Sequence, residues 1–326
     1  MCSFREIEFS QIKIKDFKNM TAFSELDKFK VDALMDRAKH GWRTPVLRTP
    51  DSVGLKYEEV FFPSMDGVPI EGWFIPGNSN NLIICNHFWP GNRYGYAGHL
   101  EALQGLGGFE VNFLNYYKKL NEAGYNILTY DFRNHGLSGD GNGRTFGLGL
   151  FEYRDVIGSL NYAKSRADTK NMTIGLMSIC LGCNSTFVGI EKYPEYFKDV
   201  KCILGLQPVS ARPFLEKSCG LMNLEKPMDE VMDYIDKDYK ESSGFGLDQL
   251  SPIEYAKSVK TPTKLFQLRR DFRTDPSDVQ AVYDNLGSKI KELHWIEGAS
   301  ERFTAYNYFG EHPELMLEWF GRFMNK

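Results

Sequence analysis

The segment TIGLMSICLGCNS, residues 173–185, carries the side chains best suited to covalent chemistry. It joins an apolar, strand-like run to a helix-like run, and a nucleophile at such a tight turn needs small residues two positions before and after it. Cys180 has Ser178 and Gly182 at these positions, whereas Ser178 and Ser185 have larger neighbours. The sterics therefore select Cys180 as the nucleophile.

A cysteine at the start of a helix can attack a carbonyl carbon, because unpaired backbone amides stabilise its thiolate and lower the pKa of such a thiol. The amide of Leu181, with one from Phe88 or Trp89, would hold the developing oxyanion, at roughly 3 kcal/mol per donor. The alternative reading is that Cys180 is a small core residue, since free cysteines are often buried.

The elements that must position this turn follow from the spacing of apolar residues. A hairpin is predicted over 57–75, around a turn with Asp66 and Gly67. Short apolar runs alternate with helical stretches, which predicts right-handed βαβ units and a buried parallel sheet. The predicted strands are 82–88, 126–132, 172–178, 202–209, 263–270 and 291–298, and the predicted helices are 111–123, 150–165, 182–193, 277–287 and 313–325.

Two segments do not fit this rhythm. Residues 1–55 are mixed, with a charged helical stretch, and are predicted to be a partly helical N-terminal extension. Residues 211–259 are rich in Met, Lys, Asp and Glu and are predicted to be a helical cap or lid. The core is then expected to comprise residues 56–210 and 260–326.

Three motifs occur in the order found in one superfamily. The S-x-C-x-G turn resembles the G-x-S-x-G elbow of the α/β-hydrolases, HFWPGNR at 87–93 resembles their H-G-x-x-G oxyanion loop, and YDFRNHGLSG at 130–139 resembles their D-x-R-x-H-G-x-S turn. The resemblance covers about residues 57–325. It implies an α/β-hydrolase fold, with a mostly parallel central sheet, helices on both faces and a helical cap.

The resemblance also implies an acid and a base. The acid should follow the next-to-last strand, where Asp271 stands, whereas Asp275 precedes a proline and suits a helix cap. The base should be a histidine after the last strand, but GASERF has Glu301 at that spacing. Glu301 either acts as base after burial or pairs with a cation such as Arg302, and His312 is a third candidate.

The loop after the predicted oxyanion residues is expected to line a substrate pocket. It is rich in glycine and aromatic residues and includes Arg93 and Tyr94, while Arg302 and Tyr306 form a second cluster near the expected base. Apolar walls with few polar groups suit an acyl chain, and an arginine suits a carboxylate or phosphate. Alternatively, the aromatic residues only pack the loop against the core.

Composition excludes several classes. With 39 Lys and Arg against 43 Asp and Glu, the net charge is -4, and no basic face suggests nucleic acid. We expect no membrane contact and a cytoplasmic location, because the N-terminus lacks the apolar core of a signal peptide. We expect six free cysteines. We expect no metal and no nicotinamide cofactor, since the CxxC of Cys180 and Cys183 lacks further ligands and the paired glycines at 147–149 follow no strand–helix turn.

The sequence thus predicts a hydrolase that acts on an ester or thioester through an acyl-cysteine intermediate. Its expected partner is a small-molecule acyl substrate, free or bound to a carrier, and a homodimer is left open. The alternatives are a cysteine-dependent acyltransferase or lyase on the same fold, and a homologue that binds a ligand without catalysis.

Overall fold

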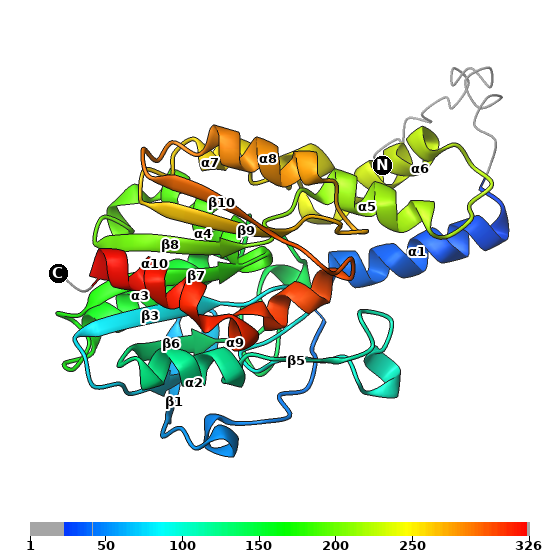
Figure 1. The fold of residues 1–326 in the computed structure, drawn as a ribbon. Helices are drawn as coiled ribbons and strands as arrows, with labels where there is room; N and C mark the ends of the chain where they lie inside the picture. The colour runs from blue at the N-terminus through cyan, green and yellow to red at the C-terminus, as the bar shows by residue number, and fades with distance from the viewer. Residues whose placement is uncertain (1–22, 41, 325–326) are drawn as a thin grey trace, which may run out of the picture.

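The computed structural model describes residues 23–40 and 42–324, and its centre is an eight-stranded sheet (Figure 1). The strand order is β1-β2-β6-β3-β7-β8-β9-β10. Strands from β6 to β10 run parallel, and the β1–β2 hairpin is antiparallel. The strands are β1 (Glu58–Pro63), β2 (Pro69–Ile75), β3 (Asn81–Asn86), β6 (Asn126–Tyr130), β7 (Thr173–Ile179), β8 (Val200–Leu206), β9 (Thr263–Leu268) and β10 (Lys291–Ile296).

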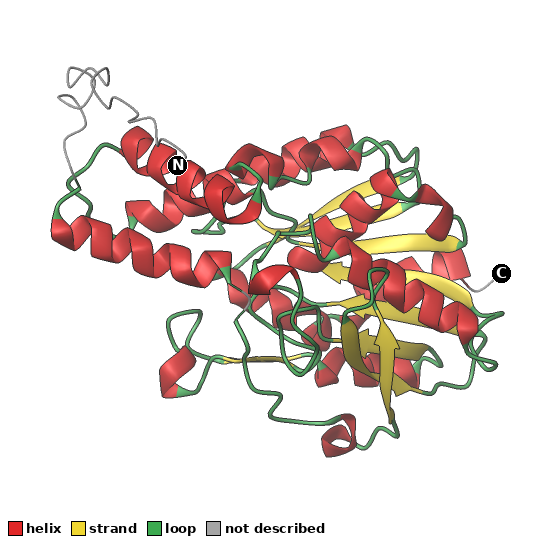
Figure 2. Ribbon diagram, turned by 180° about the vertical axis from the view of Figure 1, so that it is seen from behind, coloured by secondary structure: helices red, strands yellow, loops and turns green. Residues whose placement is uncertain are grey.

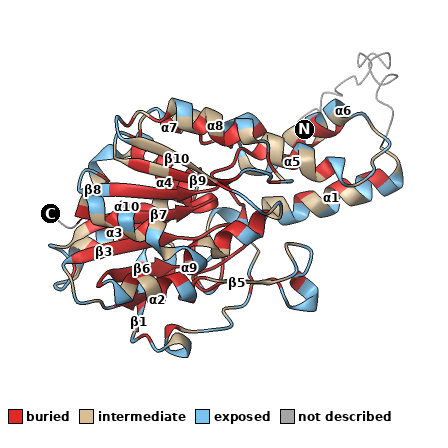
Figure 3. Cartoon of the chain, viewed as in Figure 1, coloured by how far each residue is buried: buried red, intermediate tan, exposed pale blue. Residues whose placement is uncertain are grey.

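Helices cover both faces of this sheet, so its central strands are buried (Figures 2 and 3). One face packs against α3 (Tyr153–Ser165), α4 (Leu181–Lys192) and α8 (Pro276–Asn285), and the other against α2 (Leu114–Glu122) and α10 (Pro313–Met324). All residues of β3 are buried, as expected of a parallel strand covered on two sides. The smaller elements are β4 (Gly95–Ala97), β5 (Glu110–Asn112), α9 (Tyr308–Glu311) and the 3-10 helices η2 (Pro50–Val53), η3 (Glu101–Leu103), η4 (Asn142–Arg144), η5 (Pro194–Tyr196), η6 (Leu247–Gln249) and η7 (Arg302–Asn307).

The eight strands of the sheet and the helices on its faces lie close to their predicted positions, and the predicted fold class is confirmed; the helix predicted over 111–123 begins later, at Leu114, because Glu110–Asn112 form β5. One further detail differs: β10 was expected to be buried, but most of its residues are only half-buried. The reason is its position, because β10 is an edge strand and pairs only with β9.

A helical cap stands at the carboxyl end of the strands. Of the segment 211–259, α5 (Ala211–Gly220) and α6 (Met228–Ser243) form this cap, whereas α7 (Ile253–Ala256) packs against α4 and α8 beside the sheet (Figure 1). Helix α1 (Glu25–Lys39) lies beside α5 and α6, at one end of the sheet (Figure 1). The Asp27 carboxylate accepts the Glu225 amide at 2.9 Å, and the Tyr234 hydroxyl donates to Asp32 at 2.7 Å.

Helix α1, the helical part of the predicted N-terminal extension, therefore packs against the cap helix α6. Its buried residues Val31 and Met35 join the core on the α3 and α4 side. The remainder of the expected extension, up to residue 22, lies outside the described residues. Within the described ranges, no helix combines the length and the hydropathy that a bilayer span requires.

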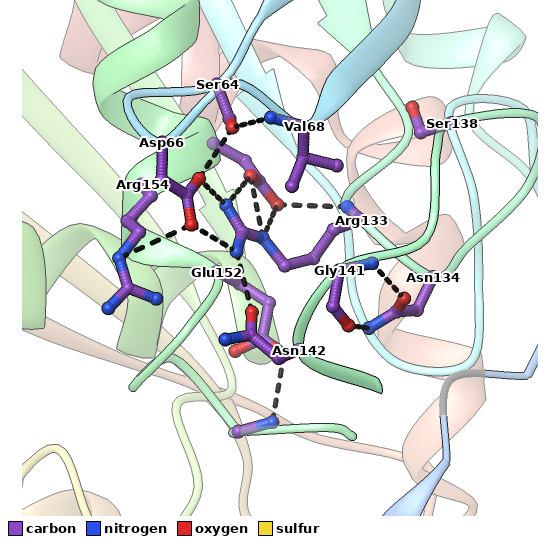
Figure 4. A network of polar contacts seen from close by, with 12 residues as sticks. Ser64, Asp66, Val68, Arg133, Asn134, Ser138, Gly141, Asn142, Glu152 and Arg154 are labelled. Carbon is purple, nitrogen blue, oxygen red and sulfur yellow. Dashed lines mark hydrogen bonds and ion pairs between the residues drawn. The ribbon is translucent and has the colours of Figure 1, made fainter. Parts of the chain in front are cut away.

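Arg133 fixes the loop that follows β6 (Figure 4). Its guanidinium, fully buried, contacts the Asp155 carboxylate at 2.7 Å and the Asp66 carboxylate at 2.5 Å, and it donates to Asn142 at 2.7 Å. Burial alone would raise the pKa of Asp66, but Arg133 and Ser64 outweigh it and lower that pKa to about 2. The Arg of the D-x-R-x-H-G-x-S turn is thus a structural cation that ties this loop to the β1–β2 turn and to α3.

Candidate active site

Cys180 occupies a strained turn between β7 and α4. Its backbone has φ 50° and ψ -107°, a conformation that residues other than glycine rarely adopt. Gly182 makes the turn possible, because a Cβ there would lie 2.4 Å from the carbonyl oxygen of Asn86. The Ser178 hydroxyl accepts from Asn86 Nδ2 at 2.9 Å. The two small residues that the sterics required are thus both in close contact with strand β3.

The turn presents Cys180 to a cavity between the sheet and the cap. The cavity volume is about 70 Å³. Its walls are mostly apolar: the cap supplies Leu34, Ala38, Phe214 and Leu215, and the core supplies Trp89, Phe146, Leu148, Val209 and Phe303. Cys180, Arg302 and Tyr306 also line it. The nucleophile candidate therefore faces an apolar space rather than packed side chains on all sides.

Arg302 connects Cys180 to Asp271. Its side chain is almost fully buried, and its Nη1 atom donates to Asp271 Oδ2 at 2.5 Å. Its Nη2 donates to the Gln207 carbonyl at 2.5 Å, and its Nε donates to the Tyr306 hydroxyl at 3.0 Å. Burial disfavours the charge of Arg302, but the attraction of Tyr306, Asp271 and Cys180 outweighs burial and raises its pKa well above the ordinary value. A permanent cation thus lies beside the thiol.

The Asp271 carboxylate is held by several donors. It lies after β9, and the Thr274 hydroxyl donates to its Oδ2 atom at 2.8 Å. Gln267 Nε2 donates to the same oxygen at 3.3 Å, and the Arg273 amide donates to Oδ1 at 2.9 Å. Asp271 is therefore positioned to fix Arg302, which lines the cavity together with Cys180.

Tyr306 provides a neutral donor next to the thiol. Its hydroxyl accepts from Arg302 Nε at 3.0 Å, and Tyr306 and Cys180 both line the cavity. Burial is the main reason that the pKa of Tyr306 is raised well above its ordinary value. The ring stacks on Phe88 with centroids 4.1 Å apart, which fixes the direction of the hydroxyl. Tyr306 therefore keeps its proton and provides a neutral hydroxyl at the cavity that Cys180 lines.

Three backbone amides near Cys180 are free to bind an anion. Within the described part of the chain, the N–H groups of Phe88, Trp89 and Leu181 donate to no acceptor. Leu181 opens helix α4, and Phe88 and Trp89 follow strand β3, which neighbours β7. Buried amides are nearly always paired in proteins, so this cluster is suited to a ligand oxygen.

Two residues that the sequence assigned to the substrate lie elsewhere. Arg93 is buried in the core and pairs with Glu71 at 2.9 Å, while its own amide donates to Asp131 at 2.7 Å. The Tyr94 hydroxyl donates to Glu110. Neither side chain lines the cavity, because the Arg93 guanidinium turns to Glu71 and Trp73 of β2 and the Tyr94 hydroxyl turns to Glu110 of β5.

Glu301 also lies apart from the thiol. Its carboxylate accepts the Phe303 amide at 3.2 Å and so caps helix η7. It lies 3.7 Å from the Arg273 guanidinium and does not line the cavity. Glu301 was considered either as a base or as the partner of a cation. The geometry matches the ion pair, and the cation is Arg273 rather than Arg302.

No histidine reaches the cavity. All six histidines belong to the described residues, and none is among the lining side chains. His87 accepts the Phe132 amide at 2.9 Å, and burial lowers its pKa well below the ordinary value. His312 is half-exposed, 3.7 Å from Glu314, and His294 packs against the aromatic ring of Phe266. The residue that lies between nucleophile and acid is Arg302, one position beyond the expected histidine.

Solved structures share this architecture at low sequence identity. A Pyrococcus furiosus esterase, Pf2001, is 21% identical, with a TM-score of 0.65 over 88% of this chain and 98% of that one. The α/β hydrolase GrgF from Penicillium sp. sh18 is 17% identical, with a TM-score of 0.57 over 83% of this chain and 100% of that one. A dienelactone hydrolase from Anabaena variabilis is 17% identical, with a TM-score of 0.52 over 83% of this chain and 99% of that one.

The sequence matches no protein-family profile and no curated protein. The evidence for identity is therefore structural: the parallel sheet, the strained turn after β7 and the likeness to these solved structures agree with one another. The chain has the α/β-hydrolase fold.

Proposed function

We propose that this chain cleaves an acyl ester or thioester through an acyl-cysteine intermediate on Cys180. The observation that carries the proposal is the place of Cys180, at a strained helix start, facing an apolar cavity and beside the buried cation of Arg302. The esterase and hydrolase names of the structural neighbours support the reaction class. The α/β-hydrolase fold alone supports no particular substrate.

In the first half-reaction, the Cys180 sulfur attacks the acyl carbonyl carbon and a new C–S bond forms. Arg302, Tyr306 and the start of α4 stabilise the attacking thiolate, since each places positive charge or a donor near sulfur. The carbonyl oxygen becomes an oxyanion, which the Leu181 and Trp89 amides hold at roughly 3 kcal/mol per donor. The bond to the leaving group then breaks.

Asp271 acts as a positioning residue in this scheme. A buried carboxylate 2.5 Å from Arg302 keeps the guanidinium charged and in one orientation. Phe88 stacks under Tyr306 and plays a similar part for the phenol. Substrate selection falls to the apolar walls, which suit the hydrocarbon part of an acyl group, free or attached to a carrier.

Intact-protein mass spectrometry after incubation with a short-chain acyl thioester tests the proposal. The expected result is a mass increase of one acyl group, absent from Cys180→Ala and retained in the matched control Cys202→Ala, whose thiol is buried in β8 away from the cavity. If wild type and Cys180→Ala gave the same spectrum, the proposed enzyme would be refuted, and a ligand-binding homologue would be the reading that remains.

A further inference from the structure

The groups around Cys180 differ from a hydrolase triad in one chemical respect: no imidazole lines the cavity, and Asp271 is paired with an arginine instead of a histidine. The position between nucleophile and acid holds a guanidinium, which stays protonated under all ordinary conditions. Tyr306 is a neutral phenol, because burial raises its pKa well above the ordinary value. The Asp271 carboxylate is fully engaged by Arg302, Thr274 and neighbouring donors.

The other carboxylates near the cavity do not replace the missing base. Asp278 accepts the Ser210 amide at 3.0 Å, and Glu152 accepts the amides of Gly147 and Gly149. Among the described residues, no carboxylate and no imidazole lines the cavity. A water molecule that attacks an acyl-Cys180 would therefore have to lose its proton without a general base.

The lack of a general base slows the transfer of the acyl group to water or an alcohol more than its transfer to a thiol. A general base contributes about 10² to 10⁴ in rate to a step that removes a proton. Water has a pKa of about 15.7 and needs that help, and alcohols are similarly weak acids. A thiol has a pKa of about 8.5, so a few per cent of it is already thiolate at pH 7. The thiolate brings no proton that must be removed.

We propose that the acyl-enzyme passes its acyl group to a thiol, so that the chain exchanges acyl groups between thiols rather than hydrolysing them. This inference rests on the proposed acyl-cysteine intermediate. The acceptor thiolate attacks the carbonyl carbon of acyl-Cys180 and forms a new C–S bond. The bond to Cys180 breaks, and the sulfur leaves as a thiolate beside Arg302 and Tyr306. No proton moves in this step, and charge balances.

The same argument assigns the donor. An alkoxide leaving group would need a proton, and the Tyr306 and Arg302 side chains that line the cavity both hold their protons, since the pKa of each is raised. A thiolate leaves without one. The preferred donor is therefore a thioester and the preferred acceptor a small or carrier-bound thiol, and the apolar cavity receives the acyl chain.

The test is a chase of isolated acyl-enzyme. The full chain is loaded with hexanoyl-N-acetylcysteamine, the donor is removed by gel filtration, and the loss of the adduct is followed by mass spectrometry in buffer, with N-acetylcysteamine, or with an equal concentration of glycerol. The expected loss with the thiol is about 100-fold faster or more than in buffer or glycerol, with recovery of the thioester. Hexanoyl-glutathione treated in the same way gives the uncatalysed exchange rate.

The substitution Arg302→His supplies the missing base beside Asp271, and Arg302→Gln is its matched control. Hydrolysis of the adduct should be at least about tenfold faster in Arg302→His than in Arg302→Gln, because both variants lose the cation and only the first gains a base. If either variant fails to fold, as judged by circular dichroism, the wild-type chase still decides the question.

The possible failures are distinct. Absence of any adduct would overturn the proposed function and the exchange reaction together. An adduct that disappears equally fast in buffer and in thiol would overturn only the exchange reaction, and would leave a hydrolase with an acyl-cysteine intermediate. Thiol-dependent loss no faster than that of hexanoyl-glutathione would likewise overturn enzymatic exchange.

Discussion

Selective alkylation of Cys180 is the most direct prediction of the site geometry. Iodoacetamide near pH 7 should modify this thiol before the other described cysteines. Cys180 faces a cavity and has Arg302 and Tyr306 beside its sulfur. The other thiols have no such partners, and their environments oppose the reactive thiolate form.

The size of the difference follows from burial. Burial raises the pKa of Cys219 to about 11 and that of Cys202 to about 12. At pH 7 these thiols are ionised to about 1 part in 10⁴ and 10⁵. Burial also raises the pKa of Cys85 and, with a smaller effect of Cys180, that of Cys183. We therefore expect labelling of Cys180 at least about 100-fold faster than labelling of any of these four.

Peptide mapping by mass spectrometry measures the labelling rate of each cysteine. The assay uses Cys2→Ser, because Cys2 lies outside the described residues, and urea-unfolded protein as the control in which all thiols react. Arg302→Met should slow labelling of Cys180, since the variant keeps the side-chain length but removes the cation. Equal rates for Cys180 and the four other thiols would refute the claim that this site activates sulfur.

Three further predictions concern the surroundings of the site. In urea unfolding, Arg302→Met and Asp271→Asn should each lower the free energy of unfolding by about 3–5 kcal/mol, because each leaves a buried charge unpaired. The double variant should lose less than the sum of the two single losses. Strictly additive losses would contradict a stabilising ion pair between Arg302 and Asp271. Gly182→Ala should abolish acyl-adduct formation and lower the melting temperature, because its Cβ would lie 2.4 Å from a β3 carbonyl oxygen; an active, equally stable variant would argue against the tight turn. The folded-state pKa of Asp66, about 2, lies below its ordinary value of 3.8, so its stabilising interaction with Arg133 is present above about pH 4 and is lost as pH falls toward 2. Asp66→Asn should show a smaller loss of stability over that range, and identical pH profiles would refute this linkage.

Much of the fold is predictable because it depends on local patterns. The runs at 82–88 and 172–178 are short and apolar, and helical stretches separate them, which is enough to predict a covered parallel sheet. The turn at Cys180 is predictable for a different reason. Its sterics involve only residues within two positions, so Ser178 and Gly182 identify it without any knowledge of distant contacts.

The rest of the site depends on contacts between distant segments. Arg302 and Asp271 are 31 positions apart and come together only because η7 and the loop after β9 meet beside the sheet. Sequence spacing directed attention to Glu301, which is one position away but caps a helix. The sequence did contain a signal for this ion pair: Arg302 stands one position beyond the expected histidine, and its partner Asp271 was the predicted acid.

Helix α1 gives a second example. Its composition is charged, and the sequence indicated a helix but not its neighbour. Its attachment depends on Asp27 accepting backbone amides nearly 200 positions away and on Val31 and Met35 filling a gap beside the cap. Arg93 shows the opposite outcome. The sequence assigned this arginine to the substrate pocket, but its ion pair with Glu71 holds it in the core.

The sequence by itself therefore determined the sheet, its covering helices and the cysteine at the strained turn, because hydrophobic period and short-range sterics act over a few residues. Only the tertiary structure decided that the cysteine faces a cavity, that a cation rather than an imidazole lies beside it, and that α1 joins the cap. These properties arise from the packing of side chains far apart in the chain, where burial decides which charges pair and which protons remain bound.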